Sequence, residues 1–139
     1  FGYKFSISEI IYIWVSGAVT MLLVVNVLLK NMWGRARPND VSYFNGFQDF
    51  NPWYKISDAC SSNCSFVSGD SSVGFLIIVF YFITKNNAYL YLGLVLGCLL
   101  GFIRIAAGGH FFSDIIFSQI VVTVTILVSF VLYKKFYDK

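Results

Sequence analysis

The segment FVSGDSSVGFLIIVFYFIT, residues 66–84, has small and polar residues near its start and continues as an almost unbroken apolar run. A helix that crosses a membrane needs about 20 mostly apolar residues, and this segment comes close to that length. Ser68, Gly69 and Asp70 stand at its head, where the first turn of a helix leaves backbone N–H groups without partners. The segment therefore predicts a membrane helix whose first turn holds an anion such as phosphate.

The rest of the sequence has the same membrane character. Of its 139 residues, 58% are hydrophobic and 12% are charged, whereas a soluble domain averages about 25% charged residues. Three further apolar runs cover residues 10–29, 88–107 and 115–133. We therefore predict an all-α, polytopic transmembrane helix bundle with four visible spans, which forms a single membrane-embedded domain over residues 1–139.

Several polar or reactive residues interrupt these runs. Ser16, Thr20 and Asn26 lie within the first run, and polar groups in membrane helices favour contacts with other helices over lipid. We expect all three to face neighbouring helices. Cys98 lies in the third run, and a free cysteine there is expected to be a small buried hydrophobe.

Residues 33–65 separate the first two runs and are predicted to form an extracytoplasmic interfacial loop. The segment contains both prolines of the chain and many aromatic residues, which suit the boundary between lipid and water. The aromatic residues fit two interpretations equally well, an interfacial belt or a grip on substrate. Cys60 and Cys64 could form a disulfide in an oxidising compartment. Zinc would need two more ligands, and His110 is the only histidine, so no metal is expected.

Basic residues near the ends of the runs bear on orientation. With four spans, one side of the membrane receives Lys4, Lys85, Lys134, Lys135 and Lys139. The other side receives Lys30, Arg35, Arg37, Lys55 and Arg104. If the second group is committed to a site, the first group marks the cytoplasmic side. The site would then face outward, toward periplasm or lumen, where a Cys60–Cys64 bridge would persist.

Antiparallel spans bring several reactive residues to one membrane surface. Arginines such as Arg37 and Arg104 bind phosphate oxygens through a planar fork, and Lys30 adds a point charge. His110 can attack phosphorus and form a covalent phosphohistidine. Asp114 follows His110 by four residues, which on a helix would place both on one face and let the carboxylate hold the ring in one tautomer.

Each of these residues alone has a more ordinary explanation. Lys30, Arg37 and Arg104 could be interfacial side chains that extend toward water. Ser68 and Gly69 could be a simple helix cap, and a lone histidine is usually a satisfied polar residue. The joint pattern favours a functional site, because charges near a bilayer are costly and usually functional.

Three motifs stand in order along the chain: Lys30-x6-Arg37-Pro38, then Ser68-Gly69, then Arg104-x5-His110-x3-Asp114. In this respect the chain resembles the type 2 phosphatidic acid phosphatase superfamily of membrane phosphatases. The resemblance implies that Lys30, Arg37, Ser68, Gly69 and Arg104 bind the substrate phosphate. It also implies that His110 is the nucleophile, that Asp114 orients it, and that no metal or other cofactor takes part.

The chain departs from this family at three motif positions and in its number of spans. Val67 replaces a proline, Ile103 replaces a serine, and Asp70 replaces the histidine that protonates the leaving oxygen. The family usually has six spans, so the four seen here are expected to be the last four, without two N-terminal helices. Residues 63–70 resemble the bacterial lipid A phosphatase branch, which implies a bacterial inner membrane with the site on the periplasmic face.

Asp70 is open to three interpretations. It could be the general acid, which requires a pKa above its reference value of about 3.9; the incoming phosphate would favour this and nearby cations would oppose it. A second interpretation is that the leaving group, such as an anomeric sugar hydroxyl or a phosphate, needs no strong acid. A third is that the site is impaired and binds without turnover.

The sequence thus predicts a metal-independent phosphatase acting on a phosphate ester or diphosphate of a lipid, such as lipid A or a polyprenyl or glycerolipid phosphate. Membrane lipids are its expected surroundings. Nucleic acid is not an expected partner, because the net charge of +3 is small and scattered. The alternative is a non-catalytic or impaired module that binds an anionic lipid head group. A purely structural bundle would leave the clustered cations and histidine unexplained.

Overall fold

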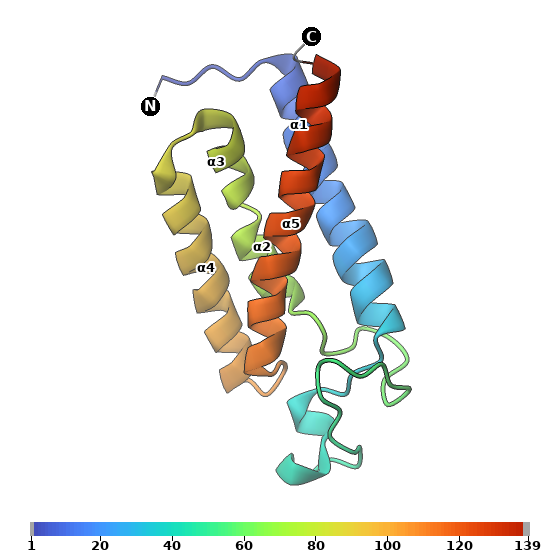
Figure 1. The fold of residues 1–139 in the computed structure, drawn as a ribbon. Coiled ribbons are helices and arrows are strands. Elements are labelled where there is room, and N and C mark those ends of the chain that lie inside the picture. Colours follow the sequence, from blue (N-terminus) through green and yellow to red (C-terminus); the bar gives the residue numbers. More distant parts are fainter. Residues whose placement is uncertain (1, 138–139) are drawn as a thin grey trace.

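The computed structural model describes residues 2–137, and this part of the chain is all-helical with no β-strand. The helices form an elongated bundle, and residues 33–65 lie at one end of it (Figure 1). Helix α1 begins and α5 ends at the opposite end. The elements are α1 (Ile7–Ala18), η1 (Val19–Lys30), η2 (Pro38–Asp40), η3 (Ser42–Phe44), α2 (Gly69–Phe75), α3 (Ile78–Thr84), α4 (Asn87–Ala106) and α5 (Phe112–Tyr137). This arrangement confirms the predicted all-α bundle.

Helix α1 runs on into η1, which has the wider winding of a π-helix. The chain starts this rod with a capping box, in which the Ser6 hydroxyl and the Glu9 carboxylate satisfy each other's backbone N–H groups. Ser16 and Thr20 are buried, as predicted. Asn26 is exposed, so the expectation that it faces other helices is wrong. Its amide donates to the Met21 carbonyl at 2.7 Å, which satisfies its polar group within its own helix.

The predicted span over residues 66–84 is shorter and less regular than expected. Helix begins only at Gly69, and α2 and α3 meet at a tight turn rather than forming one rod. In this turn Val79 N–H donates to Leu76 at 2.9 Å and Phe80 N–H donates to Ile77 at 3.1 Å, the spacing of a 3₁₀ turn. Within residues 2–137, three helical segments are long and apolar enough to cross a membrane: Ile7–Lys30, Asn87–Ala106 and Phe112–Tyr137.

A row of glycines lets α4 approach α2 and α3 closely. Gly93, Gly97 and Gly101 are the buried residues of α4, and they recur every four residues on one helix face. The Ser71 hydroxyl donates to the Gly97 carbonyl at 2.5 Å. A Cβ atom on Gly74 would lie 2.6 Å from the Gly97 Cα, so neither position has room for a side chain. Such small-residue contacts are typical of membrane helix pairs.

Replacing Gly97 by alanine is expected to destabilise the bundle by about 1–3 kcal/mol, the usual cost of overpacking. The added Cβ would overlap the buried Phe75 ring. Gly17→Ala is the matched control, because no atom lies within 4 Å of its Cβ position. There the loss of glycine's backbone freedom should stabilise the helix by about 0.5–1 kcal/mol. Unfolding in detergent micelles measures both variants, and equal stability of the two would contradict this packing.

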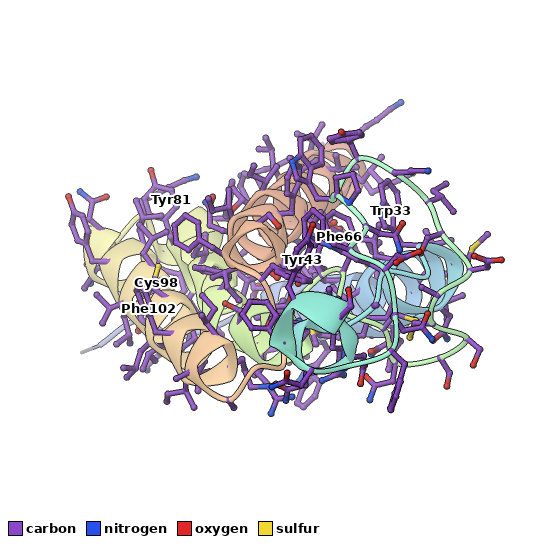
Figure 2. The ribbon with its side chains drawn as sticks, turned by 90° about the horizontal axis from the view of Figure 1, so that it is seen from below. Trp33, Tyr43, Phe66, Tyr81, Cys98 and Phe102 are labelled. Atoms are coloured by element: carbon purple, nitrogen blue, oxygen red, sulfur yellow. A yellow bond between two sulfur atoms is a disulfide. The ribbon has the colours of Figure 1, made fainter. Side chains whose placement is uncertain are left out.

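Cys98 is exposed on α4, so the prediction that it is buried is wrong. The glycine row takes the interior positions of this helix, and Cys98, next to Gly97, points to another face. Figure 2 labels Cys98 and Phe102 together on α4, on the other side of the view from Trp33 and Phe66. Its neighbours there are apolar side chains that line a shallow groove between α4 and α5, a surface suited to lipid.

Residues 33–65 form an ordered loop that is tied to the bundle. A disulfide joins Cys60 to Cys64, which resolves the question that the sequence left open. Gly34 adopts a positive φ of 67° beside the Ser57 carbonyl, a position with no room for a Cβ. Asn39 bonds across to the connection between α4 and α5, where its N–H donates to Gly108 at 3.1 Å. The loop is therefore held against the start of α5.

Most aromatic side chains of the loop are exposed, including Tyr43, Phe44, Phe47, Phe50, Trp53 and Tyr54. Trp33 is an exception, because its ring stacks on the buried Phe66 ring with centroids 4.9 Å apart (Figure 2). The exposed rings keep both interpretations from the sequence open, and the interfacial position of the loop stays a prediction.

Candidate functional site

The eight predicted site residues come from four helix ends and the loop, all at the end of the bundle where residues 33–65 lie (Figure 1). Lys30 ends η1 and Arg37 lies in the loop. Ser68, Gly69 and Asp70 open α2, Arg104 lies in the last turn of α4, and His110 and Asp114 flank the start of α5. The antiparallel packing thus brings the three sequence motifs to one surface.

The starts of α2 and α5 are joined through Ser68. This residue is the N-cap of α2, and its hydroxyl accepts from the Ser71 N–H at 3.4 Å. The Ser68 N–H donates to the Asp114 carbonyl at 3.4 Å, and the Ser118 hydroxyl donates to the Ser68 carbonyl at 2.9 Å. Ser68 is buried, so its polar groups are satisfied by α5 as well as by α2.

Lys30 lies against the first turn of α2. A Cβ atom on Gly69 would lie 3.2 Å from the Lys30 Nζ atom, so glycine leaves room for the ammonium group there. Lys30 Nζ donates to the Asn63 side chain at 2.9 Å, and Arg37 Nη2 donates to the Asn63 carbonyl at 2.8 Å. Asn63 therefore holds two cations of the site. The sequence analysis did not assign it a role, and its only signal was its place just before the Ser68 turn.

Asp70 pairs with Arg104. Arg104 Nε lies 3.0 Å from Asp70 Oδ2, but the two groups are not aligned for a hydrogen bond, and this Nε atom is buried with no hydrogen-bond partner. The two side chains are 35% and 57% exposed, so the pair is a weak surface contact. Arg37, Asp70 and Arg104 all lie within Coulombic range of Lys30. Three cations and one carboxylate thus share one partly exposed cluster.

His110 is buried, with 1% exposure, in the connection before α5. The sequence argument placed His110 and Asp114 on one helix face, but the helix begins only at Phe112. His110 Nδ1 lies 2.7 Å from the Ser65 carbonyl, which can only accept. Nδ1 therefore carries a proton, and in the neutral ring Nε2 carries the lone pair. Asp114 Oδ2 is farther from Nδ1, at 3.6 Å.

Asp114 is fully buried and each of its oxygens is bound. Oδ1 accepts from Arg35 Nη1 at 2.5 Å. Oδ2 accepts from the Ser65 hydroxyl at 2.5 Å and from the Phe111 N–H at 2.9 Å. The bond to Phe111 caps the first turn of α5. Asp114 thus organises the backbone around His110, while Ser65, which the sequence analysis did not single out, holds the ring nitrogen directly.

Arg35 is the second residue that the sequence analysis left out of the site. It is 2% exposed, and besides Asp114 it donates to the Ser113 hydroxyl at 2.8 Å and to the Asn51 carbonyl at 2.9 Å. Its guanidinium lies 4.1 Å from the centre of the Phe111 ring. Burial lowers the pKa of Arg35, and the Asp114 carboxylate opposes that effect. In the sequence, the only signal for Arg35 was a positive charge two residues before Arg37.

A metal site would need a cluster of suitable ligands. Within residues 2–137, no group of three or more His, Cys, Asp or Glu side chains is placed to hold a metal ion. The charges that the structure gathers at this end of the bundle belong to arginine, lysine and aspartate side chains.

Comparison with known proteins found relatives of this chain. The chain is 42% identical over 121 residues to a protein of Francisella tularensis subsp. novicida named lipid A 4'-phosphatase, a match that covers 84% of this chain and 53% of that protein. It is 36% identical over 98 residues to a lipid A 4'-phosphatase of Rhizobium leguminosarum, with 68% of this chain and 42% of that protein covered. The chain spans about half the length of the curated relatives it matches. No solved structure matched it.

The sequence also matches the PAP2 superfamily, over residues 11–138. The matched region includes every residue of the cationic cluster and of the buried group around His110. Since the match covers most of the chain, the chain belongs to the PAP2 superfamily.

Proposed function

We propose that this chain is the catalytic part of an integral-membrane phosphatase that removes phosphate from a lipid A-like lipid through a phosphohistidine. The observation that carries the proposal is the buried His110, whose Nδ1 donates to the Ser65 carbonyl and whose Nε2 keeps its lone pair. The curated relatives named lipid A 4'-phosphatase support this substrate class. The three membrane-length helices support the membrane location.

In the first step, His110 Nε2 attacks phosphorus, the Nε2–P bond forms and the bond from phosphorus to the lipid oxygen breaks. Negative charge on the equatorial oxygens is balanced by Lys30, Arg37 and Arg104. The first turn of α2, at Gly69, adds the positive end of the helix dipole. The leaving oxygen takes a proton and departs as the lipid hydroxyl.

In the second step, water attacks the phosphorus of the phosphohistidine and passes a proton to the Asp70 carboxylate, which restores the acid used in the first step. The Nε2–P bond breaks, its electron pair returns to Nε2, and inorganic phosphate is released. Throughout both steps Nδ1 keeps its proton and its hydrogen bond to the Ser65 carbonyl, so the ring keeps one orientation. Ser65 and Asp114 supply this orientation through buried contacts that water does not reach.

Asp70 supplies the proton in this scheme. In the free protein it is paired with Arg104. An arriving phosphate competes for the same guanidinium, since the Arg104 Nε atom has no aligned acceptor of its own. The phosphate's negative charge then favours protonation of the neighbouring carboxylate, which can pass its proton to the leaving oxygen.

The Asp70→Asn variant is therefore expected to lose about 10²–10⁴-fold in kcat, the usual contribution of a general acid. Inorganic phosphate should inhibit it more strongly, because Arg104 no longer has a competing carboxylate. The rate of phosphate release from a lipid phosphate gives kcat. Adding inorganic phosphate to the same assay gives the strength of inhibition. Asp58→Asn is the matched control, because Asp58 is an exposed carboxylate of the loop. Its loss should leave kcat and phosphate inhibition unchanged. A fully active Asp70→Asn variant would show that Asp70 is not the acid.

The site is proposed to face the periplasm of a bacterial inner membrane. The Cys60–Cys64 disulfide lies in the loop at the site's end of the bundle, and disulfides persist mainly in oxidising compartments. Three of the lysines expected on the cytoplasmic side, Lys85, Lys134 and Lys135, lie at helix ends away from that loop. This distribution agrees with the positive-inside tendency.

A panel of lipid phosphates tests the function. The chain in detergent micelles is given lipid A, a polyprenyl phosphate and phosphatidic acid, each with and without EDTA. We expect release of inorganic phosphate, fastest from lipid A and unchanged by EDTA, because protein cations neutralise the phosphate. Strict dependence on a divalent ion would contradict the mechanism, and binding without release from any lipid would favour the alternative of an anionic-lipid binding module.

A further inference from the structure

Arg35 is a buried cation at this end of the bundle that the phosphate-binding scheme does not use. It is 2% exposed, whereas Lys30, Arg37 and Arg104 are all partly accessible. Its Nη1 atom is engaged by Asp114 and Ser113 and its Nε atom by the Asn51 carbonyl. A guanidinium committed in this way to buried protein partners is poorly suited to bind substrate.

We infer that Arg35 is a positioning residue that acts on His110 through Asp114, an inference that rests on the proposed function. Arg35 holds the Asp114 carboxylate as its own ion-pair partner. The Nδ1–H group of His110 then donates its hydrogen bond to the Ser65 carbonyl instead of to the carboxylate. In a neutral imidazole held this way, the Nε2 lone pair is available for attack on phosphorus.

The distances carry this inference. Asp114 Oδ2 lies 3.6 Å from His110 Nδ1, close enough for an unpaired carboxylate to favour the imidazolium form. An imidazolium has no lone pair and cannot attack phosphorus. Arg35 Nη1 lies nearer to the carboxylate, at 2.5 Å from Oδ1, and its positive charge offsets the negative charge that His110 would otherwise experience.

The backbone around Arg35 supports the same role. The Ser65 N–H donates to the Arg35 carbonyl at 2.9 Å, while the Ser65 hydroxyl binds Asp114 and the Ser65 carbonyl binds His110. Arg35 therefore holds Asp114 with its side chain and Ser65 with its main chain. Both partners of the His110 ring depend on this one residue.

Other charged groups lie near this end of the bundle and could also act on His110. They are Lys30 of η1, Asp70 of α2, Arg104 of α4 and the loop residues Arg37, Asp40, Asp49, Lys55 and Asp58. Among residues 2–137, none of these forms an ion pair with His110 or Asp114. Arg35 is therefore the cation placed to control the protonation of this pair.

The chain contains a single histidine, so an NMR titration of isotopically labelled histidine in micelles reports on His110 alone. In Arg35→Gln we expect the titration midpoint to move to higher pH by about 1–3 pH units, the range typical of a nearby charge. The acid limb of kcat/KM should move in the same direction. Activity lost at neutral pH should return at higher pH, with KM changed by less than about threefold.

Two variants serve as controls. Lys55→Gln removes an exposed loop cation and should move neither the titration nor the rate. Arg35→Lys keeps the charge and should restore most of the parent pH profile. If Arg35→Gln does not fold, Arg35→Lys still tests the inference. A loss of activity in Arg35→Lys that is equal at every pH would overturn it.

An unchanged His110 titration in folded Arg35→Gln would also overturn it, since a purely structural role lowers activity without moving the midpoint. The NMR arm needs no substrate. If the parent protein releases no phosphate from any lipid, the proposed function fails, while the control of His110 by Arg35 is still decided by the titration.

Discussion

The His110→Gln variant is expected to lose at least about 10⁴-fold in lipid phosphate hydrolysis, because it removes the atom that forms the covalent intermediate. Glutamine is close in size and keeps a donor that can reach the Ser65 carbonyl, so the surrounding structure should survive. The measurement is phosphate release from lipid A, together with trapping of a labelled phosphoprotein from ³²P-labelled substrate.

The parent chain should carry acid-labile, alkali-stable label on histidine, and His110→Gln should carry none. Inorganic phosphate should still bind the variant, because Lys30, Arg37 and Arg104 remain in place. Asp58→Asn again serves as the control for handling and folding. Hydrolysis that survives in His110→Gln would contradict a histidine nucleophile. Binding of lipid phosphate that needs no His110, with no turnover in the parent, would indicate the binding module.

The second large effect concerns stability. Asp114→Ala is expected to destabilise the bundle by about 3–5 kcal/mol, because it leaves the Arg35 charge buried without its counter-ion. Asp114 is 0% exposed and Arg35 is 2% exposed, so water cannot replace the lost partner. The variant also frees the Ser65 hydroxyl and the Phe111 N–H, two donors that the carboxylate satisfies. Unfolding in micelles, followed by heat or denaturant, measures the change.

The matched control is Asp70→Ala, which breaks the ion pair with Arg104 at the surface of the same site. Exposed pairs contribute only about 0–1 kcal/mol, so this variant should be nearly as stable as the parent. The double variant Arg35→Met/Asp114→Leu removes both buried charges and should recover much of the stability. Equal losses for Asp114→Ala and Asp70→Ala would contradict the difference in burial.

The two predictions reflect two separate groups of charges at one end of the bundle. Lys30, Arg37, Asp70 and Arg104 form the accessible group, which is suited to meet a phosphate. Arg35, Asp114 and His110 form the buried group, which includes the proposed nucleophile. Substitutions in the accessible group should act mainly on binding and proton delivery. Substitutions in the buried group should act on stability and on the state of the imidazole.

Much of the fold could be predicted because hydrophobic length is a local property of the chain. The apolar runs over residues 10–29, 88–107 and 115–133 correspond to Ile7–Lys30, Asn87–Ala106 and Phe112–Tyr137. The run over residues 66–84 was less well predicted. Its break between α2 and α3, at Leu76 and Ile77, contains no proline or glycine that would indicate it.

The site, too, could be predicted only in part from the sequence. The spacing of the motifs was enough to name the cations, the Ser68 turn, His110 and Asp114 as candidates, since covalent spacing and helix direction determine which membrane surface each reaches. The partners of His110 could not be named in advance. Ser65 is 45 residues from His110 and Arg35 is 79 residues from Asp114, and no local pattern links residues so far apart.

By itself, the sequence of this PAP2 superfamily member determined how many apolar segments it has, roughly where they begin, and which reactive residues stand at their ends. These features follow from side-chain polarity and covalent spacing. Only the tertiary structure decided that the first turn of α2 lies against Lys30, that Cys98 faces outward, and that Arg35 and Ser65 hold Asp114 and His110. The physical reason is that those outcomes depend on which atoms meet across helices and loop, where burial makes a single contact decisive.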